Sequence, residues 1–476
     1  MLIGLALALT AHVSTVAKVA NSGASPQAAP SLDPQQALWR GVDAGRAQRR
    51  VRELVALGPR MGATRSGDAA AQYVSKVFAE LGLEVRVIET PERRAWQPLA
   101  WTLTARIEGS QEPARKLERA WPWQNSPDAM GSALLALESA QDIAWLTERA
   151  GRGASTAAVL LASRPTNSDG TWPIPGRLRE GAAQPCFGIA KTEAELLRGW
   201  LDSGAKVRID FELDAETRSA PIRTVVARLP GRRGGEAWKA PYFLFCAHGD
   251  ADSGGPGADD NASGVATVLE IATAWKRAIE AGASAPAHEV RFAIWGSEIE
   301  STRHFLQTRV PADGELLGVL NYDQSGFGSG ADQVNIEPDD LPGNVALVNA
   351  LVAVMRERAP RDASEPGDFP SRFATNKSLG GTDSYVFSGS ELFKSRALPA
   401  VSVFSSAWGA AGEHKRTAGM PGESWRERDK VRVDYDLYYH SSGDTPENTT
   451  DKEPWNMAWC ARVGLLGAVR YLEALP

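Results

Sequence analysis

The stretch Cys246-Ala-His-Gly-Asp-Ala-Asp-Ser-Gly-Gly-Pro-Gly-Ala-Asp-Asp-Asn-Ala-Ser-Gly264 places imidazole and carboxylate side chains between a strand and a helix. The apolar run 242–247 is typical of a buried strand, and 265–279 has helical periodicity. His248 and Asp260 therefore follow the carboxyl end of a strand, where open α/β sheets place their binding sites. Because zinc accepts both kinds of ligand, the stretch predicts a metal site at a sheet edge.

Strand-like and helical patterns alternate along the rest of the C-terminal half. Further strands are predicted at 225–229, 290–295, 318–322 and 400–404, and helices at 301–309, 344–358 and 454–472. Such alternation predicts an α/β fold of three layers, with a mostly parallel central sheet covered by helices on both faces.

The composition changes twice along the chain, which predicts three segments after the N-terminus. Residues 35–95 have helical patterns followed by an alternating strand at 83–90, and form the first part of the α/β domain. Residues 96–222 contain strand-like pieces such as 100–107, separated by Pro/Gly-rich turns, with one helical pattern at 191–203. We interpret 96–222 as an inserted β-rich domain and 223–476 as the catalytic domain.

The N-terminal residues 1–30 combine an apolar run with a Ser/Ala/Pro-rich stretch. This pattern is typical of a secretory signal peptide followed by a disordered spacer, and predicts export to the periplasm or the extracellular space. The usual basic residue before the apolar run is missing, so a frayed apolar helix is the alternative. No other run approaches the roughly 20 apolar residues of a membrane span.

Composition limits the partners of the chain. The 476 residues carry a net charge of -6, which gives no reason to expect nucleic-acid binding. Of the three cysteines, one pair could form a disulfide, which the sequence does not decide. The chain has no C-x-x-C motif, so metal ligation by thiolates is not expected.

Three further segments carry potential ligands: Arg291–Glu300, Val319–Asp323 and Tyr438–Thr445. Together with the first stretch they offer two His and three carboxylates as ligands. This set suits two zinc ions that share one carboxylate and a water, and such a pair can polarise a scissile carbonyl and activate the water. A further carboxylate must take the proton of that water and pass it to the leaving amine.

With these motifs the chain resembles the co-catalytic di-zinc peptidases that include bacterial leucyl aminopeptidases, carboxypeptidase Q and glutamate carboxypeptidase. Leu57-Gly-Pro-Arg-Met-Gly62 and Val225-Val-Ala-Arg-Leu-Pro-Gly231 also look like segments of that family. The resemblance covers roughly residues 40–95 and 223–476. The insert resembles the protease-associated domain that many members carry.

The resemblance implies a ligand for each of two zinc ions (Zn²⁺). His248 and Asp323 would bind one zinc, and Asp260 would bridge the two. His440 would bind the second zinc beside the acidic ligand that the family usually has. Asp250 would orient the His248 imidazole.

The acidic pair of the family is altered in this chain. Two adjacent Glu are usual, the first as general base and the second as zinc ligand, but here the string is Ser297-Glu298-Ile299-Glu300. We favour Glu298 as base and Glu300 as ligand. Alternatively, Glu298 is the ligand and Ser297 occupies the position of the base. Asp383 matches a position that would support the site from behind.

These inferences predict an exported metallo-exopeptidase that acts on peptides. An aminopeptidase that removes N-terminal residues is favoured. A carboxypeptidase or dipeptidase of the same family is one alternative, although it needs a basic residue for the C-terminal carboxylate, which the sequence does not locate. A single-zinc glutaminyl cyclase is another. The altered Glu pair supports a third, a non-catalytic binding protein on a degenerate peptidase scaffold.

Overall fold

The computed structural model describes residues 34–137, 144–147, 159–163, 166–167, 169–251, 254–328, 333–360, 366–375, 377, 381–405, 423–424 and 437–476. Contacts join these residues, from Pro34 to Pro476, into one unit. The predicted signal peptide and spacer at 1–30 lie outside the described residues.

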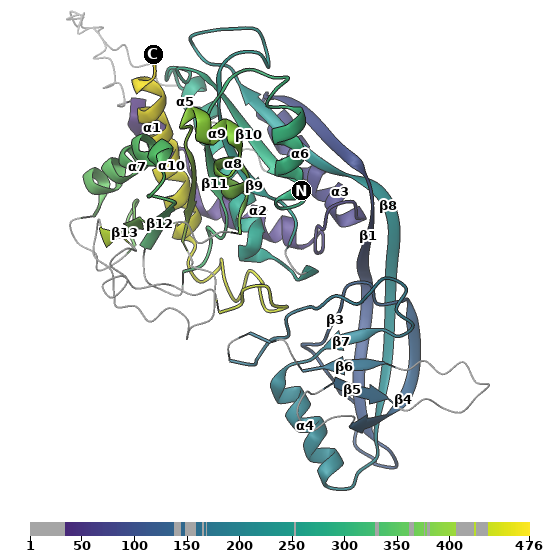
Figure 1. Cartoon of the computed structure of the whole chain (residues 1–476). Coiled ribbons are helices and arrows are strands. Elements are labelled where there is room, and N and C mark those ends of the chain that lie inside the picture. Colours follow the sequence, from purple (N-terminus) through teal and green to yellow (C-terminus); the bar gives the residue numbers. More distant parts are fainter. Residues whose placement is uncertain are drawn as a thin grey trace, which may run out of the picture. The chain divides into compact units, whose positions relative to one another are not determined.

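The predicted parallel strands pair side by side (Figure 1). Strand β9 (Tyr242–His248) lies between β10 (Glu289–Trp295) and β11 (Leu316–Tyr322), parallel to both. Strand β14 (Ala400–Phe404) pairs with β11 on the side away from β9, also in parallel. Because parallel strands end at the same edge of a sheet, the residues that follow β9, β10 and β11 come together.

Alternate side chains of these strands enter two hydrophobic clusters, one on each face of the sheet. Phe243 and Phe245 belong to the first cluster, whereas Leu244 and Cys246 belong to the second. The first cluster includes residues of α1 (Pro34–Arg40), α2 (Ala44–Val55), α3 (Arg65–Glu80), α5 (Gly264–Glu280), α7 (Val345–Arg358) and α10 (Trp455–Ala474). The second includes residues of α6 (Glu300–Thr308), α8 (Asp383–Ser388) and α9 (Glu391–Arg396). The predicted α/β fold, with helices on both faces, is confirmed.

Two long antiparallel strands, β1 (Glu84–Ile107) and β8 (Val207–Leu229), pair along their whole length. We predicted separate strands at 83–90 and 100–107. The structure has one continuous strand because β8 supplies hydrogen-bonding partners throughout, and two register shifts absorb the irregular positions. One end of β8 pairs antiparallel with β10, which joins this ribbon to the central sheet.

The chain between β1 and β8 forms short strands and one helix. These are β2 (Arg115–Lys116), β3 (Trp121–Pro122), β4 (Ala129–Leu137), β5 (Ala144–Thr147), β6 (Leu160–Ala162), β7 (Cys186–Gly188) and α4 (Lys191–Asp202). Leu103, Leu161, Phe187 and Ile209 are among the buried residues of a hydrophobic cluster of this region's own. The region is β-rich, as expected, and its likeness to a protease-associated domain stays a prediction.

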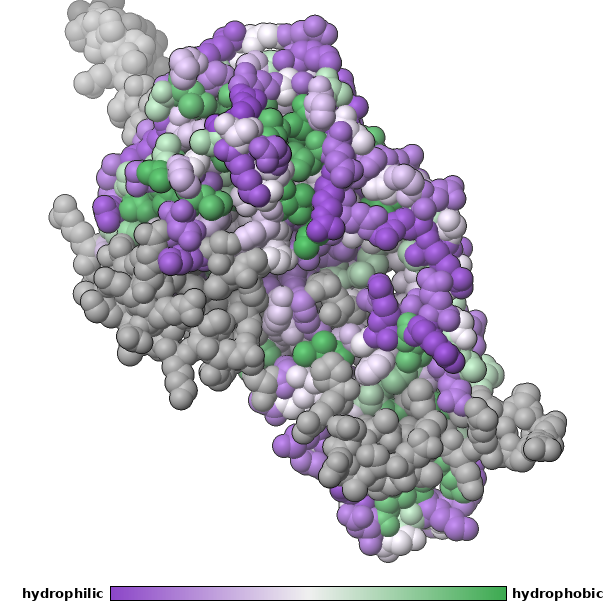
Figure 2. Space-filling view, viewed as in Figure 1, coloured by the Kyte–Doolittle hydropathy of each residue, from purple (hydrophilic) through white to green (hydrophobic). Residues whose placement is uncertain are grey.

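Strands β12 (Gln333–Glu337), β13 (Arg372–Thr375) and β15 (Glu423–Ser424) extend the sheet beyond β14 and were not predicted. A 3-10 turn at Pro342–Asn344 precedes α7. Hydrophilic and hydrophobic residues are interspersed over the described part of the face in Figure 2. No helix among the described residues combines the length and apolar character needed to cross a membrane. The three cysteines are buried, separate thiols.

Replacing Phe245 by Ala tests the packing of the central sheet. Phe245 is fully buried, and its ring centroid lies 5.8 Å from that of Phe292 and 6.4 Å from that of Tyr322. The cavity left behind should lower the free energy of unfolding by about 3–5 kcal/mol, measured by urea denaturation. Val87→Ala, at a side chain in β1 that is 48% exposed, is the control and should cost less than about 1 kcal/mol. Equal losses would contradict the described core.

Candidate metal centre

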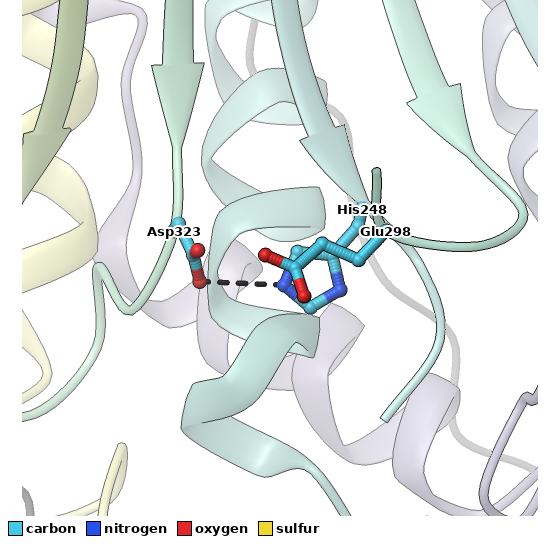
Figure 3. A group of neighbouring side chains, drawn as sticks. All are labelled: His248, Glu298 and Asp323. Carbon is cyan, nitrogen blue, oxygen red and sulfur yellow. Dashed lines mark hydrogen bonds and ion pairs between the residues drawn. The ribbon is translucent and has the colours of Figure 1, made fainter. Parts of the chain in front are cut away.

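The ends of three neighbouring strands bring His248, Glu298 and Asp323 together (Figure 3). His248 is the last residue of β9, Asp323 follows β11, and Glu298 lies in the turn after β10. Each offers one ligand atom, and these atoms lie within 4.8 Å of one another. His248 Nε2 is 3.3 Å from Asp323 Oδ1. The structure thus brings together His248 and Asp323, and their sharing of a metal ion stays a prediction.

The carboxylate of Asp260 lies between two imidazoles. Its Oδ1 is 3.3 Å from Nε2 of His248, and its Oδ2 is 3.1 Å from Nε2 of His440. Burial opposes the charged form, but the hydrogen bonds with both His hold the pKa of Asp260 below its usual range. Each oxygen therefore faces a different imidazole, as the predicted bridging ligand requires.

Asp260 takes this position from an irregular turn before α5. The backbone of the segment Ala258–Ser263 is kinked, with non-helical dihedral angles at Asp260 and Asn261, and all six of its residues are buried. Main-chain N–H groups of Asp259 and Asp260 donate to the carboxylate of Asp444, at 2.8 and 3.0 Å. Asp444 thus fixes the loop that carries Asp260. The sequence showed Asp444 near His440 but gave no sign of this contact.

Asp259 stands beside Asp260 in sequence, and its side chain has a different contact. Its Oδ1 accepts the N–H of Gly326, at 2.7 Å, in the loop after β11. This contact joins the loop of Asp260 to the loop of Asp323. Of the two adjacent acids, the structure therefore places Asp260 between the imidazoles and Asp259 in the supporting loop.

Asp250 contacts two members of the site. Its Oδ1 lies 3.2 Å from Nδ1 of His248, which leaves Nε2 of the imidazole directed at Asp260 and Asp323. The same oxygen accepts the N–H of Glu298, at 3.0 Å. The predicted orientation of His248 by Asp250 fits this geometry. The contact with Glu298 was not foreseen.

The turn that carries Glu298 is held from the other side by Asp383. One carboxylate oxygen of Asp383 accepts the N–H of Ile299, at 2.7 Å, and the hydroxyl of Thr302, at 2.5 Å. Ile299 has a φ of 61°, a conformation that is unfavourable for a β-branched residue, so these bonds stabilise a strained turn. Asp383 therefore contacts the turn that carries Glu298, and the support of the site that was expected of it stays a prediction.

Glu300, the predicted metal ligand, is not placed with the other acids. Helix α6 begins at Glu300, and its carboxylate pairs with Arg93 of β1. The turn at Ile299 separates the directions of Glu298 and Glu300, so Glu298 is the acid beside His248 and Asp323. We expected Glu300 to lie in the site as a metal ligand, but the structure pairs its carboxylate with Arg93 instead.

Glu298 is the acid whose protonation is most affected by the site. Burial raises the pKa of Glu298 to about 10, with Asp323 and Asp383 adding to the effect against the opposing charge of His248. Burial favours a neutral imidazole at His248, but Asp323, Asp250 and Asp260 outweigh it and raise the pKa of His248. The site thus concentrates acidic groups that need a cation to be stable when ionised.

The donor set fits a pair of metal ions. Asp260 and Asp323 face His248 through oxygens at 3.3 Å, and the second oxygen of Asp260 faces His440. Imidazole nitrogen and carboxylate oxygen are zinc ligands, and buried charges of this kind are usually paired or bound to metals. His248, Asp260 and Asp323 would hold one ion, and Asp260 and His440 the other.

Arg60 is a site residue whose role the sequence did not show, although its Gly-Pro-Arg motif was noted. Its side chain is buried and donates to main-chain carbonyls of Gly249, Pro256 and Gly257, at 3.1, 2.9 and 2.7 Å. Burial lowers the pKa of Arg60 to about 10. These bonds fix both ends of the loop between His248 and Asp260.

The region 96–222 also contacts the loops of the site. Trp121 Nε1 donates to the carbonyl of Gly254, at 3.1 Å, in the loop after His248. Ser442, two residues after His440, donates its N–H to the carbonyl of Pro173, at 2.9 Å. Both candidate histidine ligands therefore sit in or beside loops that are held by this region.

The family model described as "Peptidase family M28" matches residues 224–463, which is half of the chain. The chain belongs to this family. The match includes every predicted metal ligand and confirms the resemblance on which the zinc exopeptidase prediction rests.

Individual curated proteins are similar to parts of this M28 chain. An aminopeptidase of Pseudomonas aeruginosa is 30% identical over 158 residues, which cover 31% of this chain and 28% of that protein. Leupeptin-inactivating enzyme 1 of Streptomyces exfoliatus is 27% identical over 209 residues, 43% of this chain and 40% of that protein. The chain thus matches less than half the length of these curated relatives.

Solved structures share the fold over most of the M28 chain. A peptidase M28 precursor from Shewanella amazonensis has a TM-score of 0.54 at 17% identity, and covers 92% of this chain and 96% of its own. A zinc aminopeptidase from Bacillus subtilis has a TM-score of 0.52 at 15% identity, and covers 90% and 95%. At these identities the likeness concerns the fold alone.

Replacing Arg60 by Met tests the support of the loop between His248 and Asp260. The substitution keeps much of the side chain's volume but leaves several buried carbonyls without a donor, so the free energy of unfolding should fall by roughly 3 kcal/mol. Urea denaturation measures the loss. Arg65→Met is the matched control, because the Arg65 side chain is 73% exposed and pairs with Glu216 at the surface. Equal stability of both variants would contradict the assigned role.

Proposed function

We propose that this M28 protein is a zinc-dependent exopeptidase, and that it acts as an aminopeptidase. The arrangement of Asp260 between the imidazoles of His248 and His440 carries the proposal, because one carboxylate facing two imidazoles suits a pair of metal ions. The family match and the printed names of the relatives agree with peptide hydrolysis.

Zinc bound by this donor set would polarise the scissile carbonyl and lower the pKa of a water molecule. The residues of the chain supply the rest. His248 and Asp323 form one side of the site and His440 the other, with Asp260 between them. Asp250, Asp383 and Asp444 hold the loops in which these groups lie.

Glu298 is the proposed proton carrier. It lies in the turn beside His248 and Asp323, and it would accept the proton of the attacking water and deliver it to the leaving amine. Its raised pKa favours holding a proton between these two events. The positive charge of bound zinc would oppose that rise and allow Glu298 to be ionised before the water attacks.

The aminopeptidase assignment is favoured over the alternatives by the relatives. The Pseudomonas aeruginosa and Bacillus subtilis proteins are both named aminopeptidases. A carboxypeptidase or dipeptidase would use the same metals, and a cyclase would need only one. Hydrolysis of a peptide blocked at its C-terminus, together with no hydrolysis of one blocked at its N-terminus, would support an aminopeptidase, and the reverse would support a carboxypeptidase.

Metal content tests the two-ion site directly. The purified protein should bind about two zinc per chain, measured by elemental mass spectrometry after dialysis, because both imidazoles and the shared carboxylate are positioned for it. His440→Ala should reduce the content to about one, since it removes one of the two imidazoles. His288→Ala is the control, because His288 lies immediately before β10 and contacts Arg233. One zinc in the unaltered protein would favour a mononuclear site.

The Glu298→Gln variant tests the proton carrier. It should lower kcat by roughly 100-fold or more while it keeps two zinc, because the amide cannot take the proton. Loss of one zinc instead would make Glu298 a ligand, which is the alternative that the sequence left open. Glu300→Gln removes the charge that pairs with Arg93 and should retain zinc. Loss of zinc in that variant would restore Glu300 as a ligand.

A further inference from the structure

A cavity of about 260 Å³ lies beside the turn that carries Glu298. Ser297, the residue before Glu298, lines it, and so do Arg93, Arg94 and Trp96 of β1. Ser297 in the lining of the cavity and Glu298 in the candidate metal centre are consecutive residues of the same turn.

Basic side chains dominate the charge of this cavity. Three guanidinium groups, of Arg93, Arg94 and Arg177, line it together with one carboxylate, that of Glu180. Arg93 pairs with Glu300, and Arg94 lies 3.7 Å from Glu180. Arg177 donates to the amide oxygen of Gln124, at 2.9 Å, and forms no ion pair with an acid among the described residues. The Arg177 charge is available to an anionic ligand.

The charge of the cavity is opposite to that of its neighbour. The candidate metal centre gathers Asp250, Asp260, Asp323 and Glu298, whereas the cavity presents guanidinium groups. Guanidinium binds carboxylate through two parallel hydrogen bonds, so this class of anion matches the lining. The Arg93 and Arg94 side chains are 51% and 61% exposed, which lets them reach a ligand without unfolding.

We propose that this cavity is a carboxylate-binding subsite for the part of the substrate beyond the scissile bond. The substrates would be short peptides with a carboxylate close to that bond. The carboxylate is either the C-terminus of a dipeptide or tripeptide, or the side chain of an acidic residue. The proposal rests on the proposed exopeptidase function and supplies the basic residues that the sequence did not locate.

Binding of uncleavable peptides tests the subsite independently of turnover. The probe is leucyl-leucine with a methylated peptide nitrogen, as the free acid and as the C-terminal amide, in isothermal titration calorimetry with the purified protein. The free acid should bind roughly tenfold more tightly than the amide. A second pair, with Asp amide or Asn amide in place of the second leucine, reports an acidic side chain as the source of the carboxylate.

For each pair of peptides, the preference is the ratio of the dissociation constant of the peptide without the carboxylate to that of the peptide with it. If the unaltered protein shows a preference for one pair, this ratio should fall close to one in the Arg94→Gln/Arg177→Gln double variant. Arg179→Gln is the matched control, since Arg179 is exposed, neighbours Arg177 in sequence and does not line the cavity. Circular dichroism checks that both variants remain folded. No preference in the unaltered protein for either pair, or a preference that survives in the double variant, would overturn the subsite.

Failure of the proposed function is distinguishable from failure of the subsite. Hydrolysis of a leucine anilide, which has no carboxylate, reports exopeptidase activity alone. A binding preference that depends on Arg94 and Arg177, without hydrolysis of the anilide, would support the subsite and contradict the proposed exopeptidase function. Hydrolysis of the anilide without any preference for the carboxylate would support the exopeptidase function and contradict the subsite.

Discussion

The parallel pairing of β9 with both β10 and β11 is the constraint on which the rest of the site depends. It forces three carboxyl ends to one edge of the sheet, and the first polar residues after them meet there. His248, Glu298 and Asp323 lie far apart in sequence, and the pairing of the strands alone makes them neighbours (Figure 3). The apolar interior of the strands thus determines where the chemistry can be placed.

The same arrangement creates an electrostatic cost that the surrounding residues offset. Acidic groups are buried together, and unpaired buried charge is unfavourable. The supporting acids use their oxygens to accept main-chain N–H groups, so Asp250, Asp383 and Asp444 each fix a loop while their charge is partly satisfied. Arg60 holds the loop after His248 as a donor instead of an acceptor, because its guanidinium donates to main-chain carbonyls of that loop. The loops of the site are thus held by hydrogen bonds between buried side chains and main-chain groups.

The sequence predicted the central strands and the long helices, and it picked out the histidines and aspartates that meet at the candidate metal centre, because apolar periodicity and strand-end position are local signals. It did not predict that Glu300 turns away from the site. That outcome depends on a positive φ at Ile299 and on two distant acceptors, Asp250 and Asp383, which no local pattern encodes. The continuity of β1 was missed for the same reason, since it comes from pairing with a strand about a hundred residues later.

The ribbon of β1 and β8 has a consequence for how this chain can be divided. The changes in composition at 95/96 and 222/223 fall inside these two strands, which remain hydrogen-bonded to each other on both sides of those points. Cutting one strand alone would expose main-chain groups as a new sheet edge, which favours aggregation. A recombination or truncation boundary must therefore cross both strands at paired residues, such as Ala95 and Arg218, and close them with a hairpin turn. The region 96–222 is thus joined to the catalytic sheet by its main chain, and is not a module on a flexible linker.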